Sequence, residues 1–194
     1  MKKIIGVLMI MLTLSACTAL QSGLSNAYNL ANCDYKYHSI SDLIISEINV
    51  SQGLSPLMIP KVLSIISGNA SSIPLNFTLN LDVKNPNAGT AAFQALQYVI
   101  TIDDVQFTTG NFRQPFSVGA GETKRLPMTI GVDIAGLMQG ETKSAVQNIV
   151  KNFLGIGDQA TKVTVQLKPS FQVGDQMFAS PIYIPVGFSF GGKQ

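Results

Sequence analysis

Hydrophobic and polar residues alternate along much of the chain with the two-residue period of a β-strand. In residues 75–84, apolar side chains at the odd positions are separated by polar ones. Successive side chains of a strand point to opposite faces, so this pattern predicts a sheet with one packed face and one solvated face. The same alternation recurs over residues 96–102, 105–109, 126–134, 162–167 and 182–190, with a short apolar segment at 115–118.

Several short strands separated by turns predict an all-β protein built as a β-sandwich. A further strand is expected within residues 32–50, where the alternation changes phase at Glu47, which we interpret as a bulge or kink. Asp103 and Asp104 separate two strands and predict a hairpin turn rather than a calcium site. Pro185 predicts that the last strand lies at a sheet edge or carries a bulge, because proline cannot donate to the ladder.

Two segments carry helical rather than strand patterns. Residues 54–68 are apolar almost all round, and residues 140–155 space their apolar side chains as a helix does, with Gly155 as the stop. The sequence therefore predicts two short helical insertions in the sandwich. Their apolar faces fit two interpretations. They either cover an end or edge of the sandwich, or line an apolar groove for an acyl chain or a partner protein, with candidate lining residues Leu63, Ile66, Ile149 and Phe153.

The N-terminus has the pattern of an export signal. Lys2 and Lys3 precede an apolar run over residues 4–14, and the following Leu-Ser-Ala-Cys resembles the lipobox of bacterial lipoproteins. That resemblance implies a signal peptide at residues 1–16, lipidation of Cys17 by palmitate-type acyl chains, and a lipidated tether over residues 17–31. The absence of an acidic residue directly after Cys17 resembles the sorting signal for the outer membrane, and the expected location is its periplasmic face.

Charge and rare residues exclude several functions. The chain has 13 basic and 11 acidic residues, and loss of Lys2 and Lys3 with the signal peptide leaves 11 of each. A neutral mature chain without a basic stripe is not expected to bind nucleic acid. The single histidine, His38, has no obvious serine or cysteine partner, and Cys33 is expected to be a small buried hydrophobe. No metal site and no cofactor are predicted.

An ordered set of residues resembles a known family. Asn85-Pro86-Asn87 follows the first clear strand, Tyr98 lies along the next, and Gly110 ends the one after it. This order resembles the water-stress-and-hypersensitive-response (WHy) domain of the late embryogenesis abundant proteins of type 2. The resemblance covers about residues 74–190. It implies an immunoglobulin- or fibronectin-III-like fold, a stress-associated role and no established catalytic residues.

These observations predict a domain of that type over residues 32–194 and a protein that is not an enzyme. We expect an outer-membrane lipoprotein whose sandwich is a binding or protective module in desiccation or water stress. The alternative is a lipid-binding or lipid-transfer protein of the cell envelope. The expected partners are the membrane, through the lipid anchor, and an envelope protein or a lipid.

Overall fold

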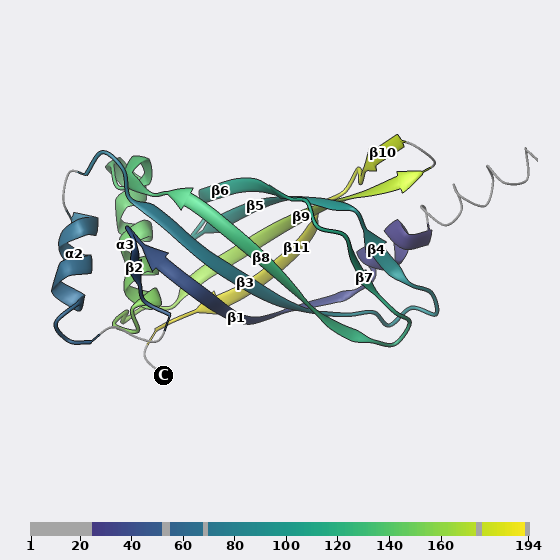
Figure 1. The fold of residues 1–194 in the computed structure, drawn as a ribbon, viewed down its shortest axis with the longest axis horizontal. Coiled ribbons are helices and arrows are strands. Elements are labelled where there is room, and N and C mark those ends of the chain that lie inside the picture. The colour runs from purple at the N-terminus through teal and green to yellow at the C-terminus, as the bar shows by residue number, and fades with distance from the viewer. Residues whose placement is uncertain (1–24, 52–54, 68–69, 174–175, 193–194) are drawn as a thin grey trace, which may run out of the picture.

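Antiparallel strands packed as two sheets of a curled β-sandwich make up most of the protein (Figure 1). The computed structural model describes residues 25–51, 55–67, 70–173 and 176–192. The predicted signal peptide and Cys17 lie outside these residues. The all-β architecture predicted from the alternating patterns is confirmed.

One sheet has the strand order β2-β1-β3-β8. Its strands are β1 (Asp34–Ile45), β2 (Ile48–Asn49), β3 (Pro74–Lys84) and β8 (Thr123–Asp133). The strand predicted at residues 75–84 is the central β3, which pairs with β1 on one side and β8 on the other. Its odd-numbered side chains are buried, among them Leu75, Leu79 and Leu81, because they face the second sheet.

The second sheet is built around β9 (Thr161–Val173). On one side β9 pairs with β5 (Ala95–Ile102), which pairs with β6 (Val105–Phe112). β11 (Ile184–Phe190) and β10 (Gln176–Ala179) also pair with β9, along its first and last parts respectively. β4 (Ala91–Phe93) and β7 (Phe116–Val118) form a separate two-stranded sheet. Pro185 lies in β11. Among the described residues, β11 pairs with β9 alone, which confirms that the strand lies at a sheet edge.

The alternation stops at residue 167, yet β9 continues six residues further. Pro169 interrupts the apolar pattern, but within β9 it lies opposite Leu96. Its carbonyl accepts a hydrogen bond of 2.7 Å from the Ser180 N–H. Pro169 lacks an N–H to donate, but its carbonyl still accepts a hydrogen bond, so a proline at this position is compatible with a strand. The β9–β10 hairpin was therefore missing from the predicted elements, as were the short strands β2 and β4.

Two-residue turns join the strands of the tightest hairpins. Asp103 and Asp104 both have positive φ angles, 47° and 65°, between β5 and β6, which confirms the predicted hairpin turn. Ser46 and Glu47 do the same between β1 and β2, with φ angles of 45° and 71°. The bulge interpretation at Glu47 is wrong, because a two-residue turn changes the phase of the alternation just as a bulge does. The register shifts of β1 lie earlier, between residues 37 and 44.

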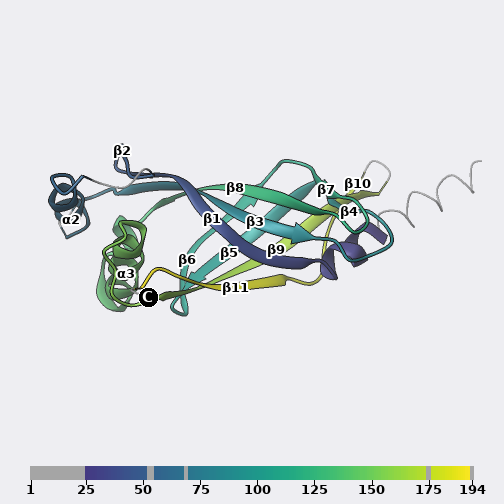
Figure 2. The ribbon, with the colours of Figure 1, turned by 90° about the horizontal axis from the view of Figure 1, so that it is seen from below.

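The two predicted helical insertions are α2 (Ile59–Ser67) and α3 (Lys143–Phe153). Both lie at one end of the elongated sandwich (Figures 1 and 2). α2 starts later than the pattern suggests, because residues 56–58 form a turn. Gly155 follows α3 with a φ of 70°, the left-handed conformation expected of a helix stop. Two 3₁₀ turns, η1 (Ala135–Leu137) and η2 (Gly140–Thr142), lead from β8 into α3.

α3 closes its end of the sandwich by placing an aromatic side chain between the sheets. The Phe153 ring centroid lies 5.6 Å from that of Phe77 on β3 and 5.2 Å from that of Phe190 on β11. Phe153 is half-buried, so it contributes less than the roughly 1.5–3 kcal/mol of a fully buried phenylalanine, but Val146, Ile149 and Val150 of the same helix are almost fully buried. The helix is therefore part of the core and not an appendage.

At the opposite end, residues 25–31 form a further helical segment. Leu30 is fully buried there, and the Tyr35 hydroxyl donates to its carbonyl at 2.9 Å. The sequence assigned these residues to the tether. Their packing places them in the folded domain.

Candidate functional site

The Asn-Pro-Asn triplet joins two turns at one end of the sandwich. The Asn85 side chain is completely buried, and its Nδ2 donates to the carbonyls of Gly89, Val118 and Gly119 at 2.8–3.1 Å. Its Oδ1 accepts from both the backbone and the side-chain nitrogen of Asn87, at 3.0 and 2.8 Å. Every polar atom of this amide therefore has a partner, which a buried amide requires. Asn85 ties the turn after β3 to the turn before β8.

Asn87 extends this network to the N-terminal helical segment. Its Nδ2 donates to the Asn29 carbonyl at 3.0 Å, and the Asn29 Nδ2 donates to the Thr90 carbonyl at 2.9 Å. The Cys33 thiol donates to the same Asn29 carbonyl at 3.2 Å. The triplet thus fixes residues 25–31 against the sandwich. Pro86 is exposed between the two asparagines.

Tyr98 and Gly110 are also a structural pair. They lie opposite each other on β5 and β6, and the tyrosine ring covers the glycine. A Cβ atom at Gly110 would overlap the Tyr98 hydroxyl and ring, so this strand position has room for glycine alone. Tyr98 is almost fully buried, and desolvation raises the pKa of its hydroxyl.

The four residues proposed for an apolar groove lie in two places. Leu63 and Ile66 of α2 line an open hollow of about 490 Å³ between the helices, together with Gln147 and Lys151 of α3. That hollow is lined by apolar and polar side chains together, and Lys151 is the one cation among them. α3 thus presents polar residues to the hollow, and Ile149 and Phe153 lie elsewhere.

Ile149 and Phe153 face the space between the sheets. They line an apolar interior cavity of about 20 Å³ with Phe77 and Phe188 among its other walls. This volume is close to that of one water molecule. An acyl chain could enter here only after α3 or a sheet edge had moved.

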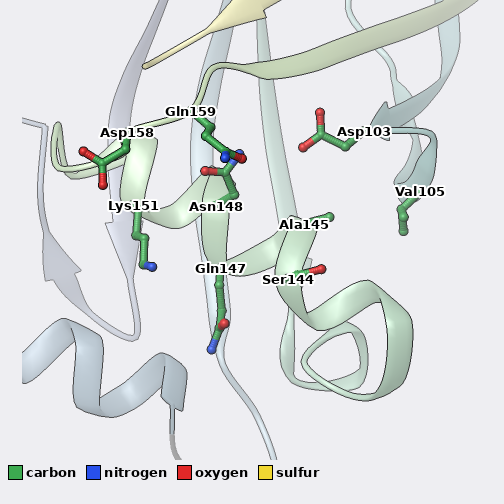
Figure 3. Close-up of a pocket in the computed structure, with 9 residues that line it drawn as sticks. All are labelled: Asp103, Val105, Ser144, Ala145, Gln147, Asn148, Lys151, Asp158 and Gln159. Atoms are coloured by element: carbon green, nitrogen blue, oxygen red, sulfur yellow. The ribbon is translucent and has the colours of Figure 1, made fainter. Parts of the chain in front are cut away.

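A second, more polar hollow of about 520 Å³ lies along α3 and shares Gln147 and Lys151 with the first (Figure 3). Figure 3 shows the carboxylates of Asp103 and Asp158 on opposite sides of it, with Asn148 and Gln159 between them. The Asp103 carboxylate accepts the backbone N–H of Lys162 at 2.9 Å. Because these side chains do not converge on one point, they do not form the acid, base and nucleophile set that catalysis requires.

His38 has charged neighbours on the outer face of the first sheet. Its Nδ1 lies 2.9 Å from the Asp82 Oδ2 and 3.0 Å from the Arg125 Nη2. Partial desolvation raises the pKa of Asp82, but hydrogen bonds from Arg125 and His38 outweigh this effect and hold it below its ordinary value. Within the described ranges, the side-chain partners of His38 are Asp82 and Arg125, and neither is a nucleophile. The cluster is a partly exposed ion pair with a histidine added, without a nucleophile.

Cys33 is buried, as predicted. Desolvation, and after it the charge of Asp34, raises the pKa of its thiol to about 11. A thiol with such a pKa is almost entirely protonated at neutral pH and is a poor nucleophile.

Asn152 is an organising residue that the sequence reasoning missed. From α3, its buried Nδ2 donates to the Thr161 hydroxyl at 2.7 Å and to the Gln159 carbonyl at 2.9 Å, and its Oδ1 accepts from the Gly192 N–H at 3.2 Å. The helix is thereby tied to the start of β9 and to the end of the chain after β11. An asparagine on the apolar side of a predicted helix was the available signal, since a buried amide needs partners.

The described residues contain no group of three or more His, Cys, Asp or Glu side chains placed to hold a metal ion. No helix among them has the length and hydrophobicity needed to cross a bilayer.

A family model described as "late embryogenesis abundant protein" (LEA_2) matches residues 80–184, more than half of the chain. The match includes Asn85, Asn87, Tyr98 and Gly110. No curated protein matches the chain.

Solved structures with a similar course of the chain share little sequence with it. A protein from Archaeoglobus fulgidus is 15% identical, with 82% of this chain and 99% of that chain covered and a TM-score of 0.39. A protein from Arabidopsis thaliana is 10% identical, with 81% and 80% covered and a TM-score of 0.45. A putative late embryogenesis abundant protein is 13% identical, with 98% and 86% covered and a TM-score of 0.38.

Proposed function

This chain belongs to the late embryogenesis abundant protein family LEA_2, and on that premise we propose that it is a stress-associated outer-membrane lipoprotein without enzymatic activity. Its sandwich acts as a binding or protective module in desiccation or water stress. Acyl chains on Cys17 hold it at the periplasmic face, since two or more chains anchor a protein stably.

One observation carries the non-catalytic part of this proposal. The residues that the family pattern singles out are used for architecture. Asn85 and Asn87 bind main-chain groups of neighbouring turns, and Tyr98 covers Gly110. Side chains that are buried and engaged in this way hold the turns of the sandwich and are not placed to react with a substrate.

The anchor is tested by cell fractionation together with palmitate labelling. The protein is expected in the outer-membrane fraction and to incorporate labelled palmitate, and Cys17→Ser is expected to lose both. Cys33→Ser is the matched control and should keep both, since its thiol is buried. A labelled Cys17→Ser protein, or an unlabelled native one, would refute the anchor.

The protective role is tested with a reporter enzyme that loses activity on drying. The chain from residue 18 onward contains every described element, and it is expected to preserve more activity than an equal mass of an unrelated β-sandwich protein. Equal recovery with both proteins would contradict a protective role and leave binding of an envelope partner.

Lipid binding is the second candidate, and the hollow between α2 and α3 favours it. Its lining combines the apolar side chains of Leu63 and Ile66 with the cation of Lys151, which suits an acyl chain with an anionic headgroup. Native mass spectrometry of the chain from residue 18, expressed in a bacterial periplasm, would then show a lipid adduct. Leu63→Asp should remove the adduct, and Leu57→Asp, on an exposed side chain outside the hollow, should keep it. A mass without adduct would exclude stable lipid binding.

A further inference from the structure

Large exposed hydrophobic side chains are concentrated in one short segment. In the described part of the chain, the large hydrophobic side chains left exposed are Tyr28, Leu57, Met177, Phe178, Ile182 and Tyr183. Four of them fall within residues 177–183, in β10 and the loop that follows it. Single exposed hydrophobic residues are ordinary, but a contiguous group marks an interaction surface.

This group begins in β10, at the end of the molecule where the chain enters the fold, and continues along the loop toward β11, where Tyr183 borders a hollow with Tyr98 and Gly110. Both views place β10 and residues 25–31 at the same end, opposite α2 and α3 (Figures 1 and 2). Tyr28 belongs to residues 25–31 and is 68% exposed. Leu57 precedes α2 and lies at the other end. We call Tyr28, Met177, Phe178, Ile182 and Tyr183 the apolar tip.

The geometry of the tip fits a lipid phase better than a flat protein surface. Neighbouring residues of a strand point to opposite faces, so Met177 and Phe178 project from the two sides of the β9–β10 hairpin. Both are about half exposed, at 56% and 45%. A protein docked on one side would leave the other side chain in water, whereas an interface between lipid headgroups and acyl chains surrounds the hairpin.

The tip also has the composition of a membrane interface. The Lys168 Nζ lies 5.3 Å from the centroid of the Tyr183 ring. Aromatic side chains with a polar end settle at the level of the headgroups, and a nearby lysine can meet their phosphates.

We propose that the apolar tip inserts into the surface of the phospholipid bilayer that holds the lipid anchor. This inference rests on the proposed anchor at Cys17. Only seven residues lie between Cys17 and residue 25, and the eight steps along the chain span at most about 29 Å at 3.3–3.6 Å each. The tip is therefore held close to the bilayer. Docking there turns the α2 and α3 end, with its hollows, away from the membrane toward the periplasm.

The absence of tryptophan from the chain provides a direct test. Phe178→Trp introduces a single fluorophore into the tip, and Leu57→Trp is the control at the other end. Each full-length, lipidated protein is reconstituted into vesicles of phosphatidylethanolamine and phosphatidylglycerol with brominated acyl chains. We expect quenching and a blue shift for Phe178→Trp alone. Proteins that float with the vesicles without quenching at Phe178→Trp would overturn docking and leave the anchor intact.

A second measurement separates docking from the anchor. The chain from residue 18 without lipid is titrated with the same vesicles. Phe178→Ser with Ile182→Ser should weaken partitioning by about tenfold or more. Full burial of one such side chain contributes roughly this factor, and each of the two is about half exposed, so together they contribute about as much. Leu57→Ser should not change it. If the unlipidated native chain shows no partitioning and Phe178→Trp shifts instead with protein concentration, the tip is an interface between copies and the proposal fails.

Discussion

Replacing Asn85 with aspartate tests the claim that the family triplet is a structural junction. The side chains are nearly equal in size, so Asn85→Asp changes chemistry and leaves shape almost unaltered. The Nδ2 that donates to three carbonyls becomes an oxygen facing them at 2.8–3.1 Å, while Oδ1 can still accept from Asn87.

The expected loss of unfolding free energy follows from the two N–H groups that Asn85→Asp removes. A buried carbonyl deprived of its donor costs about 1–3 kcal/mol, so the variant should lose about 2–6 kcal/mol of unfolding free energy at neutral pH. A domain of this kind has roughly 5–15 kcal/mol in total. The variant is therefore expected to fold with much reduced stability.

The loss should also depend on pH. Burial and the three carbonyls disfavour the charged form, so the pKa of the new carboxyl is raised in the folded state above its unfolded value of about 3.9. The folded state then binds the proton more tightly. The stability of the variant relative to the native chain is therefore greatest below about pH 3.9, and it falls as the pH rises through the raised pKa of the folded state.

The assay is urea unfolding of the native chain and of the variant at pH 7 and pH 4.5. Asn111→Asp, on an exposed side chain of β6, is the matched control and should change stability by no more than about 0.5 kcal/mol. A similarly small effect of Asn85→Asp at pH 7 would refute the reasoning. A large loss that is identical at both pH values would show that charge is not its cause.

Three further predictions concern single sites. Gly110→Ala should lose about 1–3 kcal/mol of unfolding free energy, because the new Cβ overlaps Tyr98. Adding Tyr98→Leu should restore part of that loss, which a double-mutant cycle by urea unfolding would measure. Hydrogen bonds from the Ile73 N–H, the Ser72 hydroxyl and the Ala135 N–H lower the pKa of Asp133. The stability that Asp133 contributes is therefore present above the ordinary carboxyl pKa and is lost as the pH falls below it. Urea unfolding midpoints measured between pH 2 and pH 7 should depend less on acid in Asp133→Asn than in the native chain. Cys33 should react with a thiol reagent only after unfolding, and rapid modification of the native protein would contradict its burial.

Strand positions could be predicted where one face of a strand is buried and the other is solvated. β3 is the clearest example, since Leu75, Leu79 and Leu81 alternate with polar residues and are buried. The β5–β6 hairpin was also predictable, because two adjacent aspartates tolerate the positive φ angles that its turn needs. Both signals come from neighbouring residues and can therefore be recognised in a single sequence.

The missed elements depend on contacts between distant parts of the chain. β10 is half exposed on both faces and has no alternating pattern, so only its pairing with β9 defines it. The hairpin turn at Ser46 and Glu47 carries no glycine, which allowed it to be mistaken for a bulge.

The candidate site shows the same limit. Leu63, Ile66, Ile149 and Phe153 were grouped because all four lie on apolar helix faces. Helical spacing shows which residues share a face, but not which neighbour that face meets. α3 turns Ile149 and Phe153 into the core and Gln147 and Lys151 toward α2. The partners of Asn152, likewise, lie seven to forty residues away along the chain.

The mass of the N-terminal peptide of the mature protein tests the central claim most directly. The protein would be purified from membranes, digested and measured by mass spectrometry. The account predicts a peptide that begins at Cys17 and carries a diacylglyceryl group, with or without a further acyl chain on its amino group. A peptide that begins elsewhere, or an unmodified Cys17, would contradict the lipoprotein on which both the proposed function and membrane docking depend.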